Sequence, residues 1–170
     1  FISQKQFVIT KNWDETVNSF IWSSDSKNLY ANVPYRGTIQ LFRIEMPGSL
    51  ESGEHARFKQ ISKTEHDYNA IVGISGKELI CMRTDFNHAA EIFAVHIETG
   101  EARQISQVNT EAYSHIQMSP VQKHWIKTSD GQSMLTWVIY PPQFDSTKKY
   151  PTLLYCQGGP QSTVSQFWSY

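Results

Sequence analysis

The 170-residue chain has almost no surplus of charge of either sign. Fifteen Lys and Arg residues stand against 16 Asp and Glu residues, for a formal net charge of −1. Binding to nucleic acid or to an anionic membrane surface needs a basic excess, so the composition argues against both partners. No apolar run approaches the roughly 20 residues that a transmembrane helix needs, so we expect no membrane span.

Cysteine is also scarce, with only Cys81 and Cys156 present. Both lie in short apolar runs that are typical of strands, so we expect two free, buried thiols rather than a disulfide. The histidines include no His-Glu-x-x-His pair or similar metal-ligand spacing, and we predict neither a metal site nor another cofactor. A surface or strand-packing role is expected for each of the six: His55, His66, His88, His96, His115 and His124.

Signals for helices are few, whereas short segments of alternating apolar residues are common, which is typical of strands. The segment 28–33, for example, places Leu29, Ala31 and Val33 on one face and Tyr30 on the other. A loop is expected over 84–90. The expected strands are 7–9, 19–22, 28–33, 39–44, 57–62, 70–74, 78–83, 91–97 and 103–106.

These strands fall into two similar units. Leu29 corresponds to Leu79, and Leu41-Phe42 corresponds to Ile92-Phe93. The tripeptide Gln-Ile-Ser ends both units, at 60–62 and at 104–106. Repeats of four strands with a period of about 50 residues indicate blades of a β-propeller. A plain antiparallel sandwich with accidental similarity is the alternative.

The pattern changes after Ser119-Pro120, where we place a domain boundary. The sequence Asp130-Gly131 between two apolar segments is a strong hairpin signal. A polar linker follows, and the apolar run 153–156 is short enough to be a buried strand. The turn Gly158-Gly159-Pro160 then breaks the pattern. It is either a tight turn of purely conformational origin or a means of presenting backbone N–H groups to a ligand.

The second half of the chain carries a series of short motifs that we interpret jointly. They are Lys127-Thr128-Ser129-Asp130-Gly131, Trp137, Tyr140-Pro141-Pro142-Gln143-Phe144-Asp145, Lys148-Lys149-Tyr150-Pro151 and Gln157-Gly158-Gly159-Pro160-Gln161-Ser162. With the blade-like segment 22–27 upstream, this series resembles the prolyl oligopeptidase family of serine peptidases, in its acylaminoacyl-peptidase and dipeptidyl-peptidase branch.

The resemblance implies a mostly β chain of two parts. Residues 1–119 would form part of a β-propeller, about two antiparallel four-stranded blades with flanking strands. Residues 120–170 would form the N-terminal part of an α/β-hydrolase catalytic domain. Because both ends look cut, we expect an internal fragment of a longer protein. The dipeptidyl-peptidase likeness also favours an exported or periplasmic bacterial protein.

The resemblance further implies a serine exopeptidase that hydrolyses short peptides, of dipeptidyl- or acylaminoacyl-peptidase type. The family's nucleophile lies in a Gly-x-Ser-x-Gly elbow, and no such pentapeptide occurs in this chain. We therefore expect no catalytic residue here and place the Ser, Asp and His downstream. The chain alone should be inactive, with short peptides and the rest of its own chain as partners. The alternative is a non-catalytic propeller or sandwich module that binds a peptide or a protein.

The catalytic contribution implied for this chain is an oxyanion loop made of Gln157, Gly158 and Gly159. Relatives with His-Gly-Gly-Pro use a backbone N–H of this turn, and others use a tyrosine hydroxyl at the position of Gln157. Glutamine at this position matches neither pattern and offers no side-chain hydroxyl. We therefore expect the backbone N–H of Gly159 to be the oxyanion donor. The Gln157 amide either orders the loop or makes a purely structural hydrogen bond. Trp168 either flanks the active-site cleft or packs in the core.

Overall fold

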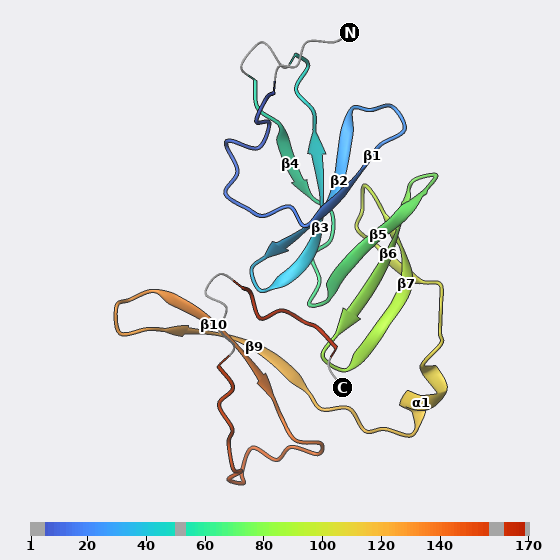
Figure 1. The fold of residues 1–170 in the computed structure, drawn as a ribbon. Helices are drawn as coiled ribbons and strands as arrows, with labels where there is room; N and C mark the ends of the chain where they lie inside the picture. Colours follow the sequence, from blue (N-terminus) through green and yellow to red (C-terminus); the bar gives the residue numbers. More distant parts are fainter. Residues whose placement is uncertain (1–5, 50–53, 157–161, 169–170) are drawn as a thin grey trace.

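The computed structural model of the chain describes residues 6–49, 54–156 and 162–168. They form three antiparallel sheets (Figure 1). Each sheet pairs its strands in chain order. The first sheet contains β1 (Ser19–Trp22), β2 (Asn28–Tyr35), β3 (Thr38–Glu45) and β4 (Arg57–Gln60); the second contains β5 (Asp67–Ser75), β6 (Glu78–Asp85), β7 (His88–His96) and β8 (Ala102–Gln104).

A short helix and a separate hairpin follow the second sheet. The helix α1 spans Thr110–Ser114, and the third sheet pairs β9 (Val121–Lys127) with β10 (Ser133–Ile139). The turn between β9 and β10 contains Gly131 with a φ of 81°, a backbone conformation that glycine adopts without strain. The prediction of a mostly β fold with four-stranded antiparallel units is confirmed. The assignment of 120–170 to a hydrolase domain stays a prediction.

Equivalent serines close the two four-stranded units in the same way. The Ser62 hydroxyl accepts a hydrogen bond from Leu41 N at 2.8 Å, and the Ser106 hydroxyl accepts one from Ile92 N at 2.8 Å. The isoleucine before each serine binds the same strand residue as the serine does: Ile61 N donates to Leu41 O, and Ile105 N donates to Ile92 O. The Gln-Ile-Ser repeat therefore marks a shared structural role, because the serine satisfies a backbone donor where the outer strand ends.

The main core lies between the first and second sheets. The first sheet contributes residues of β2 and β3, and the second sheet contributes residues of β5, β6 and β7. Figure 1 shows the two sheets next to each other. Burial of this apolar surface is the principal force that holds the two units together. The buried residues of this core are Tyr30, Leu41, Ile61, Tyr68, Leu79, Cys81, Val95 and Ile97.

The opposite face of the first sheet is covered by residues 6–18. Ile9, Trp13 and Val17 pack onto Leu29, Phe42 and their neighbours. The predicted strand 7–9 is wrong: the segment is irregular and makes its contacts mainly through side chains. Ala56 N donates to Ile9 O at 3.2 Å, and this is the one backbone bond between residues 7–9 and another part of the described chain. An apolar triplet becomes a strand only where a neighbour supplies a hydrogen-bonding ladder.

The predicted loop over 84–90 is also wrong, because β6 and β7 extend through it and leave a two-residue turn. Polar side chains close this turn. The Asp85 carboxylate accepts from Asn87 N at 2.7 Å, and the Thr84 hydroxyl donates to His88 O at 2.6 Å. Short polar side chains favour such turns because they bond to the local backbone.

The run 153–156 is not the buried strand that its apolar residues predict. Leu153, Leu154 and Tyr155 are 97%, 85% and 80% exposed, and the segment pairs with no strand of the described residues. Cys156 is free but exposed, whereas Cys81 is free and buried as expected. Burial raises the pKa of the Cys81 thiol to about 12. The expectation about 153–156 fails because a strand in the interior of a sheet needs neighbours on both sides.

Candidate functional site

The residues predicted to form the oxyanion loop, Gln157, Gly158 and Gly159, lie outside the described residues. The structure does describe the residues that follow the loop. Residues 162–168, called here the C-terminal segment, run between the third sheet and the turn end of the second sheet (Figure 1). The candidate site is therefore the group of contacts that holds this segment.

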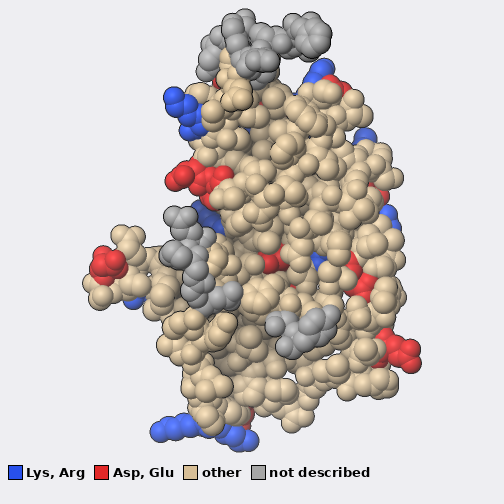
Figure 2. All heavy atoms as spheres, viewed as in Figure 1, with Lys and Arg blue, Asp and Glu red and all other residues tan. Residues whose placement is uncertain are grey.

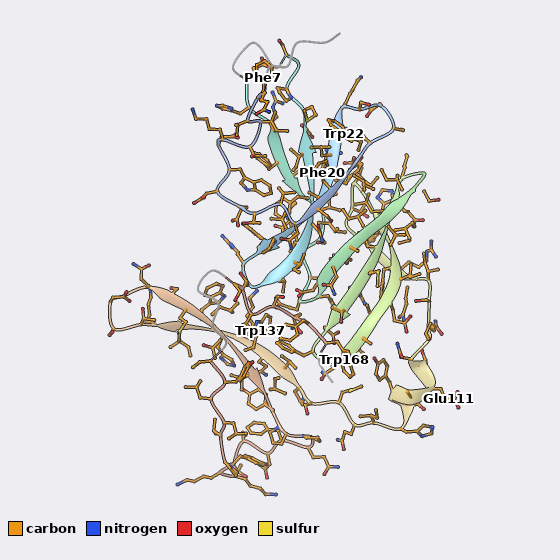
Figure 3. The ribbon with its side chains drawn as sticks, viewed as in Figure 1. Phe7, Phe20, Trp22, Glu111, Trp137 and Trp168 are labelled. Atoms are coloured by element: carbon orange, nitrogen blue, oxygen red, sulfur yellow. The ribbon has the colours of Figure 1, made fainter. Side chains whose placement is uncertain are left out.

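Aromatic rings hold the C-terminal segment from two sides. The Phe86 ring lies 5.7 Å from the Trp137 ring and 5.9 Å from the Phe167 ring, measured between centroids. The Trp137 indole donates to Val164 O at 2.9 Å, and Phe86 N donates to the Gln166 side-chain oxygen at 3.0 Å. Figure 3 shows Trp137 and Trp168 in this region. These contacts connect β10 and the β6–β7 turn through the segment.

Trp168 also contacts the helix that follows the second sheet. Its ring centroid is 6.1 Å from that of Tyr113 in α1. The Tyr113 ring packs in turn against His88, with centroids 5.2 Å apart. Trp168 is half-buried in this arrangement. It therefore lies against α1 rather than in the main core.

A buried carboxylate joins both blade-like units to the C-terminal segment. Asp67 has no exposed surface, and its carboxylate accepts from Ile39 N at 2.8 Å. Burial raises the pKa of Asp67 above its usual value of 3.8, and interactions with Ser165, Ile39 N–H and Gln166 N–H partly oppose this rise. Ser165 and Gln166 are themselves buried. A buried carboxylate with such partners fixes the position of the chain around it.

Because the pKa of Asp67 is raised in the folded state, we expect the free energy of unfolding to depend on pH. Between pH 3.8 and the higher native pKa, the folded state binds more protons than the unfolded state. Asp67 therefore lowers the free energy of unfolding as pH rises through this window. Asp67→Asn should remove this contribution, so that urea unfolding midpoints depend less on pH above pH 4. Asp14→Asn, at an exposed position, is the control. An unchanged pH dependence in Asp67→Asn would contradict this assignment.

A second cluster lies at the turn end of β6 and β7. Asp85 Oδ2 is 3.6 Å from His66 Nε2, and Asp85 Oδ1 is 2.9 Å from His88 Nδ1. Burial, followed by the charge of Arg83, lowers the pKa of His66, although Asp85 opposes this. Sequence reasoning missed this cluster. The spacing of Asp85 and His88 around a turn is a local signal, but His66 comes from the linker before β5.

We also searched the described residues for metal-ligating clusters and for helices that could span a membrane. Across the described ranges, no three His, Cys, Asp or Glu residues lie close enough together to hold a metal ion. None of the helices in the described part of the chain combines the length and apolar character that crossing a membrane requires.

The fold matches part of a known class of peptidase structures. Pyrococcus horikoshii acylaminoacyl peptidase, in an orthorhombic crystal form, superposes with a TM-score of 0.71 and 19% identity over 95% of this chain and 23% of that chain. The AtxE2 isopeptidase without ligand gives a TM-score of 0.61 and 14% identity over 80% of this chain and 20% of that chain. At these identities the likeness shows the fold alone.

Proteins related in sequence identify the family more specifically than the structural neighbours do. Dipeptidyl-peptidase 5 of Porphyromonas gingivalis is 35% identical over 98% of this chain and 23% of its own length. Dipeptidyl-peptidase 5 of Aspergillus fumigatus is 23% identical over 95% of this chain and 22% of its own length. No family model matches the chain. The resemblance to the prolyl oligopeptidase family is confirmed: homologues named dipeptidyl-peptidase 5 and structural neighbours named acylaminoacyl peptidase cover nearly the whole chain. The chain spans less than a quarter of the length of the Porphyromonas gingivalis protein.

Proposed function

We propose that the chain is the junction between the β-propeller and the catalytic domain of a serine exopeptidase that cleaves short peptides. The observation that carries this proposal is the 35% identity to a dipeptidyl-peptidase 5 over 98% of the chain. Residues 1–119 are assigned to the propeller, which limits access to the site. Residues 120–170 are assigned to the start of an α/β-hydrolase domain. The dipeptidyl and acylaminoacyl activities are both compatible with these relatives.

The proposed catalytic contribution of this chain is electrostatic. In a serine peptidase, a Ser-His-Asp triad forms a tetrahedral intermediate whose oxyanion must be stabilised. The assignment gives this role to a backbone N–H of the Gly158-Gly159 turn, and the triad to another part of the protein. Such donors are effective when they are held in place before the reaction. The contacts of Asp67, Phe86 and Trp137 described above would fix the carboxyl side of the turn.

The absence of a recognisable nucleophile makes a direct prediction for the chain on its own. We expect a fluorophosphonate probe, which labels activated serines, to leave this 170-residue chain unlabelled. The intact protein, carrying the catalytic residues, should be labelled once per chain under the same conditions. Stoichiometric labelling of the 170-residue chain would contradict the assignment of the nucleophile to another segment. An intact protein that takes up no probe would favour a non-catalytic peptide- or protein-binding module.

A further inference from the structure

A polar pocket of about 340 Å³ opens at the turn end of the second sheet. Its walls come from β6 and β7, from His66 before β5 and from α1. The pocket adjoins the C-terminal segment through the contact of Tyr113 with Trp168. In Figure 2, basic and acidic atoms lie close together over the second sheet, whereas much of the face in view carries neither.

The unusual group in this pocket is the guanidinium of Arg83. Its Cζ lies 3.5 Å from the centroid of the Phe93 ring, so the planar group is held flat against an aromatic face. Among the described residues, Arg83 forms no ion pair with a carboxylate. The side chain is half-buried. Arg83 also interacts with the Tyr68 hydroxyl, but a guanidinium carries five N–H donors, so donors remain for a planar acceptor.

The carboxylates beside Arg83 are engaged with other groups. Glu91 faces Arg83 across the strand pair, but its oxygens bind the Ser106 hydroxyl and the Asn109 backbone and side-chain N–H groups. Asp85 accepts from Asn87 N and interacts with His88 Nδ1. The carboxylates of the pocket therefore have hydrogen-bond partners of their own, and among the described residues neither forms an ion pair with Arg83.

Two further groups in the pocket have hydrogen-bonding capacity to spare. The Tyr113 hydroxyl accepts from Ala89 N at 2.7 Å, which leaves its own hydrogen available for donation. Within the described part of the chain, the buried His66 Nδ1 has no hydrogen-bond partner. Buried polar atoms without partners are rare and call for an explanation. An incoming acceptor could take a hydrogen bond from the Tyr113 hydroxyl. His66 does not add a donor: its Nε2 lies 3.6 Å from Asp85 Oδ2, and a neutral ring with its proton on Nε2 has an accepting Nδ1.

We propose that this pocket binds a carboxylate group of a peptide, with Arg83 as its ion-pair partner and Tyr113 as an additional donor. The fork of a guanidinium matches the two oxygens of a carboxylate. A volume near 340 Å³ suits one side chain or one chain end rather than a long segment. The carboxylate belongs either to an acidic side chain or to the peptide's C-terminus. This inference rests on the proposed function, because it specifies the class of peptide substrate.

The test is a binding measurement that needs no turnover. Three fluorescent tetrapeptides are titrated into the 170-residue chain and into the intact protein and followed by polarisation. One ends in glutamate with an amidated terminus, one ends in glutamine with a free terminus, and one ends in glutamine with an amidated terminus. We expect one of the two carboxylate probes to bind at least about tenfold more tightly than the uncharged probe. The tighter of the two identifies the source of the carboxylate.

Variants assign the effect to Arg83. Arg83→Met keeps an unbranched side chain over Phe93 but removes the charge, and it should abolish the preference for a carboxylate. Arg83→Lys should retain part of it. Arg103→Met is the matched control, because Arg103 is an exposed residue of β8 that pairs with Glu78, and it should leave the preference unchanged. Equal binding of all three probes, no binding to the intact protein, or an unchanged preference in Arg83→Met would each overturn the proposal.

The experiments distinguish failure of the pocket proposal from failure of the peptidase assignment. If the intact protein cleaves peptides but shows no preference for a carboxylate, the pocket proposal fails and the peptidase assignment stands. If the preference is present and depends on Arg83 while no peptide is cleaved, the pocket proposal stands and the peptidase assignment fails.

Discussion

Gly159→Val in the intact protein is expected to lower kcat by about 100-fold, the typical loss when one oxyanion donor is removed. Glycine at this position permits the backbone to approach the scissile carbonyl closely. Valine would add a branched side chain where that carbonyl must lie. The effect should appear mainly in kcat because the oxyanion forms only after the nucleophile has attacked.

Gln157→Ala is the matched comparison for Gly159→Val. Because the proposed donor is a backbone N–H, loss of the glutamine side chain should reduce kcat far less. Steady-state kinetics on a dipeptidyl or N-acyl-amino-acid reporter measures both effects, and circular dichroism checks that each variant is folded. The donor would be wrongly assigned if a folded Gly159→Val variant were nearly fully active, or if Gln157→Ala were the more damaging change.

Gly100→Ala should destabilise the chain by about 2–5 kcal/mol, from left-handed backbone strain together with overpacking. Gly100 lies in the turn between β7 and β8 with a φ of 75°. A Cβ added there would lie 2.2 Å from Ile61 O, a backbone atom that cannot rotate away. Because Ile61 belongs to the core between the first and second sheets, the substitution should push these sheets apart.

Gly76→Ala separates the two causes of this destabilisation. Gly76 also has a positive φ, 58°, but a Cβ at this position would meet no atom within 4 Å. The expected cost is about 1 kcal/mol from backbone strain alone. Urea unfolding of both variants gives the comparison. Equal losses of stability at the two positions would show that contact with Ile61 contributes nothing.

Much of the fold could be predicted because its signals are local. Alternation of apolar residues identified β2 and β3 and assigned Leu29 and Tyr30 to opposite faces, which the two separate cores confirm. The Asp130-Gly131 pair identified the β9–β10 hairpin. The repeated Gln-Ile-Ser tripeptide identified the two units, since a serine in the same place performs the same hydrogen bonding in each.

Features that depend on distant residues were not predictable from the sequence. The apolar run 153–156 resembles a strand, but strand formation depends on neighbours that the run does not itself specify. Asp67 contacts Ile39, and His66 contacts Asp85; nothing in the spacing of either pair indicates the contact. The candidate site is built almost entirely from such non-local contacts. For this reason the sequence indicated the loop but not the groups that hold the C-terminal segment after it.

We propose that this chain is part of a peptidase that acts on short peptides. The most direct test is to incubate the intact protein with a pentapeptide, in free and N-acetylated forms, and to follow the products by mass spectrometry. We expect release of an N-terminal dipeptide from the free form or of an acetyl-amino acid from the acetylated form, and loss of that activity after fluorophosphonate treatment. Intact peptides of both forms after prolonged incubation with folded protein would contradict it.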